Sequence, residues 1–565
     1  PELMGGGSVF MGEVQSEDFY HKWMSLYHRI QTHSYREVAE EAAYTWFNRL
    51  MAIRIMVKNE LVPAVLEYES DEVRIPLLVS EARQRRFPQM NEESRQKLEA
   101  LLNNDALTDE QFAVLIVAYC HSSPIIHKSF GAISDYTELL LPSNILAKDG
   151  FIDKLNADEY ISDEDYRSPE LIGWLYQFYI SERKDEVFAK KSKFEADEIP
   201  AATQIFTPNW IVKYMVQNTV GRIYLDNNPY TDIKKEMQYL VEPVEPTPAD
   251  AIYQFENIHD LTCADLACGS GHILNECFDL LYQIYIEEGY NRRKAVEDIF
   301  RYNLTGIDID TRAKQLATFA LLMKACQKDA SFVDAHCMPR VLDMPVPYAE
   351  AMGKTFNTPD EERTFIRSVL SEYIMGGNAE VLDELTDAVS LMNDAQTLGS
   401  IMKFTISERT RNVIAVRTAE YEQQEVLSED IRKILPYMRI ILTLTQNYAV
   451  LVMNPPYMGG GNMNEVLGKY VKENYENSKA DLFSVFMDLA IDRLKQEGKY
   501  GMINMQSWMF LSSFEKLRKK VLDNYQIDSM LHLGPRTFDE LSGEVVQNTA
   551  FVISRNHKEN TQGTY

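Results

Sequence analysis

Short apolar runs alternate with helix-like stretches from about residue 200 onward, and this alternation constrains the fold more than any other feature of the sequence. The runs "LTCADLACGSG", "NLTGIDID", "YAVLVMNPPY" and "GKYGMINMQSW" are typical of strands. Between them lie amphipathic segments such as "HILNECFDLLYQIYI" and "DLFSVFMDLAIDRLKQ". Alternation of this kind predicts a mainly parallel sheet with helices on both faces. We therefore expect an α/β fold in this part of the chain.

Residues 17–200 have a different pattern, which predicts an N-terminal helical domain. Apolar residues recur there at helical spacing and form one continuous stripe, namely Val38, Ala42, Trp46, Leu50 and Ile53. The preceding residues 1–16 begin on Pro1 and contain three consecutive glycines. We interpret them as a cloning remnant and expect them to be disordered.

A second helical stretch, residues 346–440, interrupts the α/β region. It contains 16 acidic residues against 10 basic ones, and its pattern is helix-like throughout. We interpret it as a helical insertion that divides the α/β core into residues 201–345 and 441–565.

The bulk composition excludes several classes of protein. A net charge of −28 argues against a generic basic nucleic-acid coat, although it leaves local basic patches such as "KLRKK" (516–520) open. No apolar run approaches the ~18 residues that a transmembrane helix needs, so we expect a cytoplasmic protein without membrane contact. The six cysteines form no C-x-x-C pair and have no histidines at metal-ligand spacing. A bound metal is therefore not expected.

The most specific motif is the tetrapeptide Asn454-Pro455-Pro456-Tyr457, which ends an apolar run abruptly. Asn454 offers a side-chain carbonyl, and Pro455 offers a backbone carbonyl whose direction Pro456 holds. Two acceptors at fixed spacing suit an exocyclic amino group, because they stabilise charge as its nitrogen attacks a methyl sulfonium. Tyr457 would supply a ring on which a base stacks once it has left a duplex. The alternative is a strand that merely ends in a proline-rich turn.

Glycines follow this tetrapeptide at positions 459–461, and another glycine-rich segment, "DLACGSGH", lies earlier in the chain. We expect the glycines at 459–461 to form a mobile loop over the site. In the second, Asp265 ends a strand, and Gly269 and Gly271 allow a tight turn into a helix where a ligand can approach the backbone. A dinucleotide fingerprint would need a third glycine, but position 274 is leucine. The loop therefore indicates a nucleoside-containing ligand without identifying it.

Two further aspartates follow apolar runs. Asp308 in "LTGIDID" is placed to accept hydrogen bonds from ribose hydroxyls, and Asp343 in "PRVLDMP" to meet an adenine amino group. The alternative for each is a solvated aspartate at the end of a strand. Upstream, "QIFTPNW" predicts a helix start with Thr207 as N-cap and Pro208 as first helical residue.

The order of these motifs resembles that of amino-group DNA methyltransferases that use S-adenosylmethionine. More narrowly, "NPPYMGGGNMN", "SKADLFSVFMDLA" and "HLGPRTFDELSGEVVQNTAF" resemble the PglX family, the adenine methyltransferases of BREX phage-defence systems. The resemblance implies a Rossmann-like methyltransferase sheet and catalysis by residues 454–457. It also implies a cofactor site and a second base-stacking aromatic, Phe538. The expected cofactor residues are Phe206, Thr207, Pro208, Asp265, Ala267, Gly269, Gly271, Asp308 and Asp343.

The resemblance implies N6-adenine methylation of double-stranded host DNA, carried out beside other BREX components. This methylation would distinguish the host's own DNA from phage DNA. A phage protein that mimics DNA would compete for the same groove. Members of the family are much longer and carry a target-recognition region after these motifs, whereas this sequence ends at Tyr565. We therefore expect that region to lie outside this chain, and the recognised DNA sequence stays open.

Three alternatives remain open at this point. The same tetrapeptide serves enzymes that methylate a glutamine amide in a protein, and RNA is a further substrate class. A fused nuclease is suggested by Glu182-Arg183-Lys184, which has the E-x-K form with Glu170 upstream. That chemistry needs Glu and Lys on one face, which a strand provides at this spacing and a helix does not. The third is a non-catalytic interaction module, in which the acidic insertion binds partner proteins. Such binding would accompany methylation and would not replace it.

Overall fold

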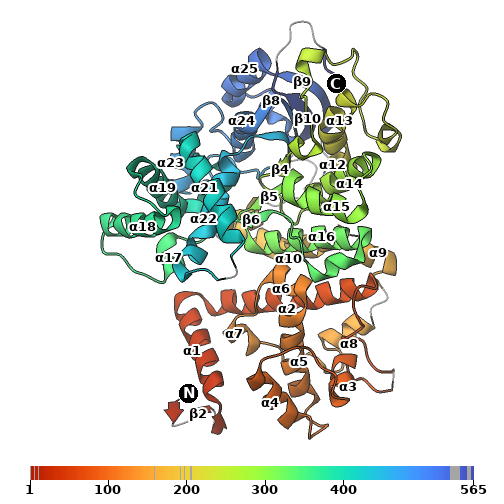
Figure 1. The fold of residues 1–565 in the computed structure, drawn as a ribbon, viewed down its shortest axis with the longest axis vertical. Helices are drawn as coiled ribbons and strands as arrows, with labels where there is room; N and C mark the ends of the chain where they lie inside the picture. The colour runs from red at the N-terminus through yellow and green to blue at the C-terminus, as the bar shows by residue number, and fades with distance from the viewer. Residues whose placement is uncertain are drawn as a thin grey trace. The chain divides into compact units, whose positions relative to one another are not determined.

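The computed structural model describes the chain except for residues 1, 5–6, 11, 71, 158–159, 169, 191, 196–197, 204–206, 425, 535–536, 538–546 and 557–561. It divides into two compact units: residues 1–171 with 322–336, and residues 172–321 with 337–565. The first unit is mostly helical, and the second contains the large sheet (Figure 1). The division differs from our boundary at residue 200, because residues 172–200 belong to the unit with the sheet.

The helical unit is organised around α2, Tyr35–Lys58, which begins with a capping box between Ser34 and Glu37. All five residues of the predicted stripe on this helix are buried. Its other helices are α1 Glu17–Thr32, α3 Leu77–Arg83, α4 Glu92–Leu101, α5 Thr108–Ser122, α6 Pro124–Phe130, α7 Asp135–Glu138, α8 Phe151–Asn156 and α9 Asp163–Arg167. No helix of the described residues is long and apolar enough to cross a membrane.

The N-terminal segment departs from the prediction of disorder. Its described residues form three short antiparallel strands, β1 Glu2–Met4, β2 Gly7–Phe10 and β3 Glu13–Gln15. The Phe10 ring lies 5.4 Å from that of Phe19 on α1, and this apolar contact gives the hairpin a surface to pack against.

The second unit contains a seven-stranded sheet in the order β6-β5-β4-β7-β8-β10-β9. Strands β4 to β8 run parallel, whereas β10 is antiparallel to both β8 and β9. The prediction of a mainly parallel, Rossmann-like sheet is confirmed. The strands are β4 Cys263–Asp265, β5 Leu304–Asp308, β6 Val341–Asp343, β7 Tyr448–Met453, β8 Leu494–Met505, β9 Gln526–Gly534 and β10 Asn548–Ser554.

Helices cover both faces of this sheet (Figure 1). Gly501 of β8 lies against Met215 of α12, and a Cβ there would be 3.1 Å from the Met215 Cβ. The other face is covered by α24 and α25, which contact β8 and β9. The helices of this unit outside the insertion include α10 Glu170–Ala189, α11 Ile199–Thr203, α12 Asn209–Val216, α13 Arg222–Asn227, α14 His272–Glu287, α15 Arg292–Asp298, α23 Glu465–Asn474, α24 Leu482–Arg493 and α25 Glu515–Asn524. The helix α16, Thr311–Lys328, is divided between the two units at residue 321.

The stretch predicted as a helical insertion is helical between β6 and β7. Its helices are α17 Tyr348–Met352, α18 Pro359–Ile374, α19 Ala379–Leu391, α20 Ala395–Leu398, α21 Glu408–Glu422 and α22 Glu429–Thr445. A 3-10 turn, η9 Gly399–Ile401, follows α20 and reaches the sheet, where the Ser400 hydroxyl donates to the Leu266 carbonyl at 2.5 Å.

Gly271 is required by the turn between β4 and α14, which leads to a prediction about stability. Its φ is +87°, and a Cβ there would lie 2.9 Å from the Cβ of Ala317. Gly289 has a φ of +86°, but a Cβ there would have no atom within 4 Å. Its substitution therefore measures the backbone strain without a steric clash. We expect Gly289→Ala to lower the free energy of unfolding by about 1 kcal/mol and Gly271→Ala by at least about twice that. Urea denaturation of the two variants measures the difference, and equal losses would contradict it.

Candidate active site

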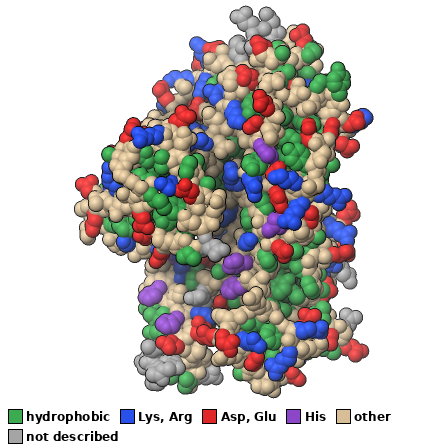
Figure 2. Space-filling model, in the orientation of Figure 1, with side chains coloured by type: hydrophobic (Ala, Val, Ile, Leu, Met, Phe, Trp, Pro, Cys, Tyr) green, Lys and Arg blue, Asp and Glu red, His purple; other side chains and the backbone are tan. Residues whose placement is uncertain are grey.

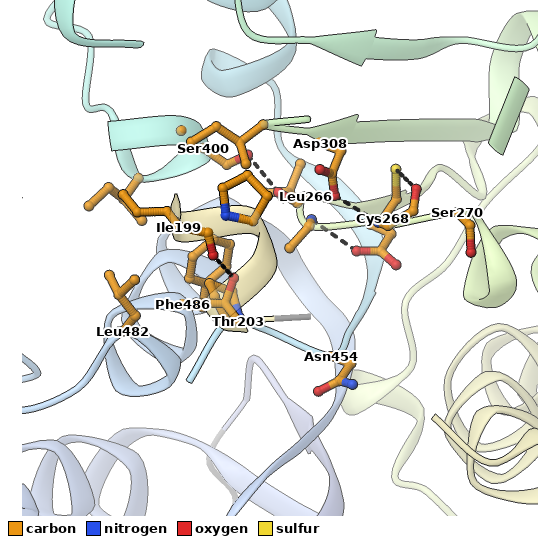
Figure 3. A pocket seen from close by; sticks show the side chains of 18 of the residues that line it. Ile199, Thr203, Leu266, Cys268, Ser270, Asp308, Ser400, Asn454, Leu482 and Phe486 are labelled. Atoms are coloured by element: carbon orange, nitrogen blue, oxygen red, sulfur yellow. Dashed lines mark hydrogen bonds between the residues drawn. The ribbon is translucent and has the colours of Figure 1, made fainter. Parts of the chain in front are cut away.

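One pocket lies where β4, β5 and β7 end, at the carboxyl edge of the sheet. Figure 3 shows Asp308 and Asn454 on opposite sides of it, with Leu482 and Phe486 of α24 along one wall. In an open α/β sheet this edge is where ligands bind. Its lining residues include Gly173, Gln177, Thr207, Asp265, Ala267, Gly269, Asp308, Ser400, Asn454 and Pro456.

The glycine loop is attached to the neighbouring strand by two hydrogen bonds. Cys268 N donates to the Ile307 carbonyl at 2.9 Å, and Gly269 N donates to Asp308 Oδ2 at 2.7 Å (Figure 3). Gly269 has a φ of +52°, in the left-handed region that favours glycine. The loop and the Asp308 carboxylate therefore form one wall of the pocket.

The two aspartates of this wall carry raised pKa values. Burial raises the pKa of Asp308 to about 7, although the backbone N–H groups of Asp310 and Gly269 donate to it and oppose the shift. Burial also holds the pKa of Asp265 well above its usual range, and the nearby Asp308 carboxylate raises it further. A ligand that brings hydroxyl groups or positive charge would stabilise both ionised carboxylates.

Asn454 is held in the pocket by Thr207. Its Nδ2 donates to Thr207 Oγ1 at 2.9 Å. We predicted Thr207 as a helix N-cap, and this is wrong: α12 begins at Asn209, its N-cap is Pro208, and there is no side-chain capping bond. The one-residue shift leaves the Thr207 hydroxyl to accept from Asn454, which fixes the plane of the amide.

Tyr457 is fixed at both ends of its side chain. Its hydroxyl donates to the Ile503 carbonyl at 3.0 Å, and its ring meets that of Phe483 edge-on at 6.0 Å. Burial raises the pKa of its phenol. The ring is half-buried rather than enclosed, so it is positioned but retains some accessible surface.

The glycine segment 459–461 differs from the mobile loop that we predicted. Gly459 forms an antiparallel bridge with Asp481, and Gly460 N donates to the Ala480 carbonyl at 3.0 Å. Asp481 also accepts from Met458 N at 2.9 Å, and burial raises its pKa to about 6. These contacts tie the segment after the tetrapeptide to the start of α24.

The structure places the predicted site residues unequally. Thr207, Asp265, Ala267, Gly269, Asp308, Asn454 and Pro456 line the pocket. Pro208, Gly271, Asp343, Pro455 and Tyr457 are not among its lining residues. Asp343 lies in register beside Asp308 and forms an ion pair with Lys314 at 3.5 Å. Phe206 and Phe538 fall outside the described residues.

Several segments contribute lining residues that sequence reasoning missed, among them α10, α11, α24 and the insertion. Gly173 and Gln177 come from α10, and residues 397–401 come from the insertion. Tyr176, between the first two, donates its hydroxyl to Asp310 Oδ2 at 2.7 Å, two residues beyond Asp308. No motif marks these positions, because their role depends on how distant segments pack.

The E-x-K triplet at residues 182–184 lies within α10, which spans Glu170–Ala189. On a helix, residues two apart point in different directions. The strand geometry that the nuclease alternative requires is therefore not present there.

Comparison with known proteins identifies the family. The chain is 37% identical over 562 residues to the adenine-specific methyltransferase BrxX of Escherichia coli O9:H4 (strain HS), an alignment that covers 94% of this chain and 45% of that protein. It is 34% identical over 554 residues to the adenine-specific methyltransferase PglX of Lacticaseibacillus casei (strain Zhang), covering 94% of this chain and 44% of that protein. The chain belongs to the BrxX and PglX family.

Two further findings agree with this membership. Residues 302–538 match the model of the Eco57I restriction-modification methylase family. The chain is also 24% identical over 390 residues to the type II restriction enzyme and methyltransferase RM.Eco57I of Escherichia coli, covering 65% of this chain and 30% of that protein. The chain spans less than half the length of the BrxX and PglX relatives that it matches.

Proposed function

We propose that the protein transfers a methyl group from S-adenosylmethionine to the N6 amino group of adenine in double-stranded DNA. The observation that carries the proposal is the shared pocket of Asn454 and Asp308, which joins an amide suited to an amino group with a carboxylate suited to a ribose. The names of the BrxX and PglX relatives support adenine as the target.

The wall formed by the glycine loop and the Asp308 carboxylate fits this cofactor. Asp308 would accept hydrogen bonds from the ribose hydroxyls, and the two raised carboxyl pKa values favour a partner that donates hydrogen bonds or carries positive charge. The bound cofactor supplies an electrophilic methyl group. Asp265 and the glycine loop would bind its amino-acid end, while Gly173, Gln177 and residues 397–401 enclose it and exclude water.

The tetrapeptide would bind the adenine amino group on two acceptors, the Asn454 side-chain carbonyl and the Pro455 backbone carbonyl. The Thr207 hydroxyl holds the Asn454 amide nitrogen at 2.9 Å, so the carbonyl end of that amide is already oriented before the base arrives. Preorganised acceptors of this kind stabilise the positive charge that develops on the amino nitrogen. Tyr457 would stack on the base.

As a biological role we propose host DNA marking in BREX-type phage defence, together with other components of such a system.

The first experiment uses the full-length protein, methyl-labelled S-adenosylmethionine, unmethylated phage DNA and a cell protein extract. We expect label in DNA, and sequencing of the product would map the methylated adenines. Label in protein alone would contradict the proposal and indicate methylation of a glutamine amide. Label in RNA alone would contradict it and indicate RNA as the substrate.

The contact between Thr207 and Asn454 gives a prediction about positioning. Thr207→Val removes the hydroxyl that accepts from Asn454 Nδ2, whereas Thr207→Ser keeps it. We expect the valine variant to lose about tenfold in kcat, the value of roughly one hydrogen bond, with little change in cofactor affinity. The serine variant should retain kcat. A loss in the serine variant without a loss in the valine variant would show that the methyl group of Thr207, rather than its hydroxyl, supports the site.

A further inference from the structure

The turn after β8 exposes two adjacent apolar side chains. It connects η10, Gln506–Met509, to η11, Ser512–Phe514, and Phe510 and Leu511 lie between them. Phe510 is 66% exposed and Leu511 is 53% exposed. Single exposed apolar residues are normal on a protein surface, but two large ones side by side at a turn suggest contact with an apolar partner surface.

This turn is well braced. Phe510 N and Leu511 N both donate to the Ser507 carbonyl, at 3.2 and 3.0 Å. Arg518 Nη1 donates to the carbonyls of Trp508 and Leu511, at 2.8 and 2.6 Å. The backbone of the turn is thus fixed from both sides while its two apolar side chains point into solvent.

The turn is connected to the proposed base-binding residue Tyr457 in two ways. Tyr457 donates to the Ile503 carbonyl on β8, the strand that leads into the turn. A series of rings makes a second connection, since Tyr457 lies 6.0 Å from Phe483, which lies 5.3 Å from Phe514 of η11. Because β7 and β8 are parallel, Phe510 and Leu511 follow β8 on the same edge of the sheet where Asn454 follows β7.

The charges next to the turn complement a nucleic-acid backbone. On the face drawn in Figure 2, acidic and basic side chains are interspersed, so attraction to DNA depends on local clusters. The segment 516–520 at the start of α25 is such a cluster, with Lys516, Arg518, Lys519 and Lys520. Lys516 and Lys520 form ion pairs with Glu476 and Asp488, whereas within the described part of the chain Arg518 and Lys519 form none. Lys519 can therefore bind a phosphate, and so can the part of the Arg518 guanidinium beyond the Nη1 that braces the turn.

We propose that Phe510 and Leu511 form a wedge that enters the base stack of duplex DNA beside the target adenine. Apolar side chains inserted between base steps partly unstack them, and this lowers the cost of moving a base out of the duplex. Arg518 and Lys519 would bind the flanking phosphates and set the position of the wedge. The inference rests on the proposed function and adds how the duplex is opened.

The test compares two DNA duplexes that contain the methylation site identified by sequencing in the first experiment. In one the target adenine is paired with thymine, and in the other it lies opposite an abasic position, so it is already unpaired. The variant is the full-length protein with Phe510→Ser and Leu511→Ser. The matched control is Leu522→Ser, which removes an apolar side chain of α25 that is 59% exposed.

We expect the double variant to lose at least about tenfold in kcat/KM on the paired duplex and to retain the wild-type value on the abasic one. The control should match wild type on both. Equal loss on both duplexes would overturn the wedge and indicate that the turn packs against another part of the protein. No loss on either would also overturn it. If the wild-type protein methylates neither duplex, the proposed function fails, and the wedge fails with it.

Discussion

Replacing Asn454 by alanine is expected to abolish methyl transfer, with a loss of at least about a thousandfold in kcat. The substitution removes the side-chain acceptor for the adenine amino group, so the charge that develops on that nitrogen loses its preorganised partner. It also removes the donor to Thr207 Oγ1, 2.9 Å away in the structure. Asn454 and Asp308 lie on opposite sides of the pocket (Figure 3), so cofactor affinity should change by less than about threefold.

The measurement is single-turnover methylation of DNA, combined with titration calorimetry of the cofactor. Asn524→Ala is the matched control, because this asparagine is exposed at the end of α25 and its amide donates to the Lys520 carbonyl. It should leave both quantities at the wild-type level. A parallel loss of cofactor affinity and rate in Asn454→Ala would show that the amide faces the cofactor instead of the base.

The sheet and its chemistry could be predicted because local pattern determines both. The run that forms β7 is buried on both faces, and two prolines end it where the backbone must leave the sheet. β9 and β10 were not identified from the sequence. β10 is buried along its whole length, so it lacks the alternation of apolar and polar residues that marks a half-buried strand.

The rest of the pocket could not be predicted from local pattern. Gly173 and Gln177 line it from a helix that the sequence assigns to the N-terminal region, and Ser400 reaches it from the insertion. Such contacts depend on tertiary packing between segments more than a hundred residues apart, which spacing alone does not encode. Thr207 shows the limit at short range, since a shift of one residue changed its role from capping to holding Asn454.

Replacing Asp308 by alanine is expected to lower cofactor affinity by about a hundredfold, the value of two hydrogen bonds to a charged group. The carboxylate already accepts from the backbone N–H groups of Gly269 and Asp310, at 2.7 and 2.9 Å. Its loss therefore also removes one of the two hydrogen bonds that attach the glycine loop to the neighbouring strand. Asp343→Asn tests the neighbouring aspartate separately: a comparable loss there would support our expectation that Asp343 meets the adenine of the cofactor.

The pH dependence distinguishes a direct role of Asp308 from a structural one. Its pKa is about 7 in the free protein, and hydrogen bonds from ribose hydroxyls favour the ionised form, so cofactor affinity should fall as the pH drops below 7, by up to about tenfold per pH unit. Asp308→Asn does not titrate there and should give a flatter curve. Protein stability without cofactor should show the opposite sign, since the raised pKa stabilises the fold fully below about pH 4 and this contribution is lost as the pH rises through 7. A wild-type affinity that stays constant between pH 5 and 8 would exclude Asp308 as the acceptor of the ribose.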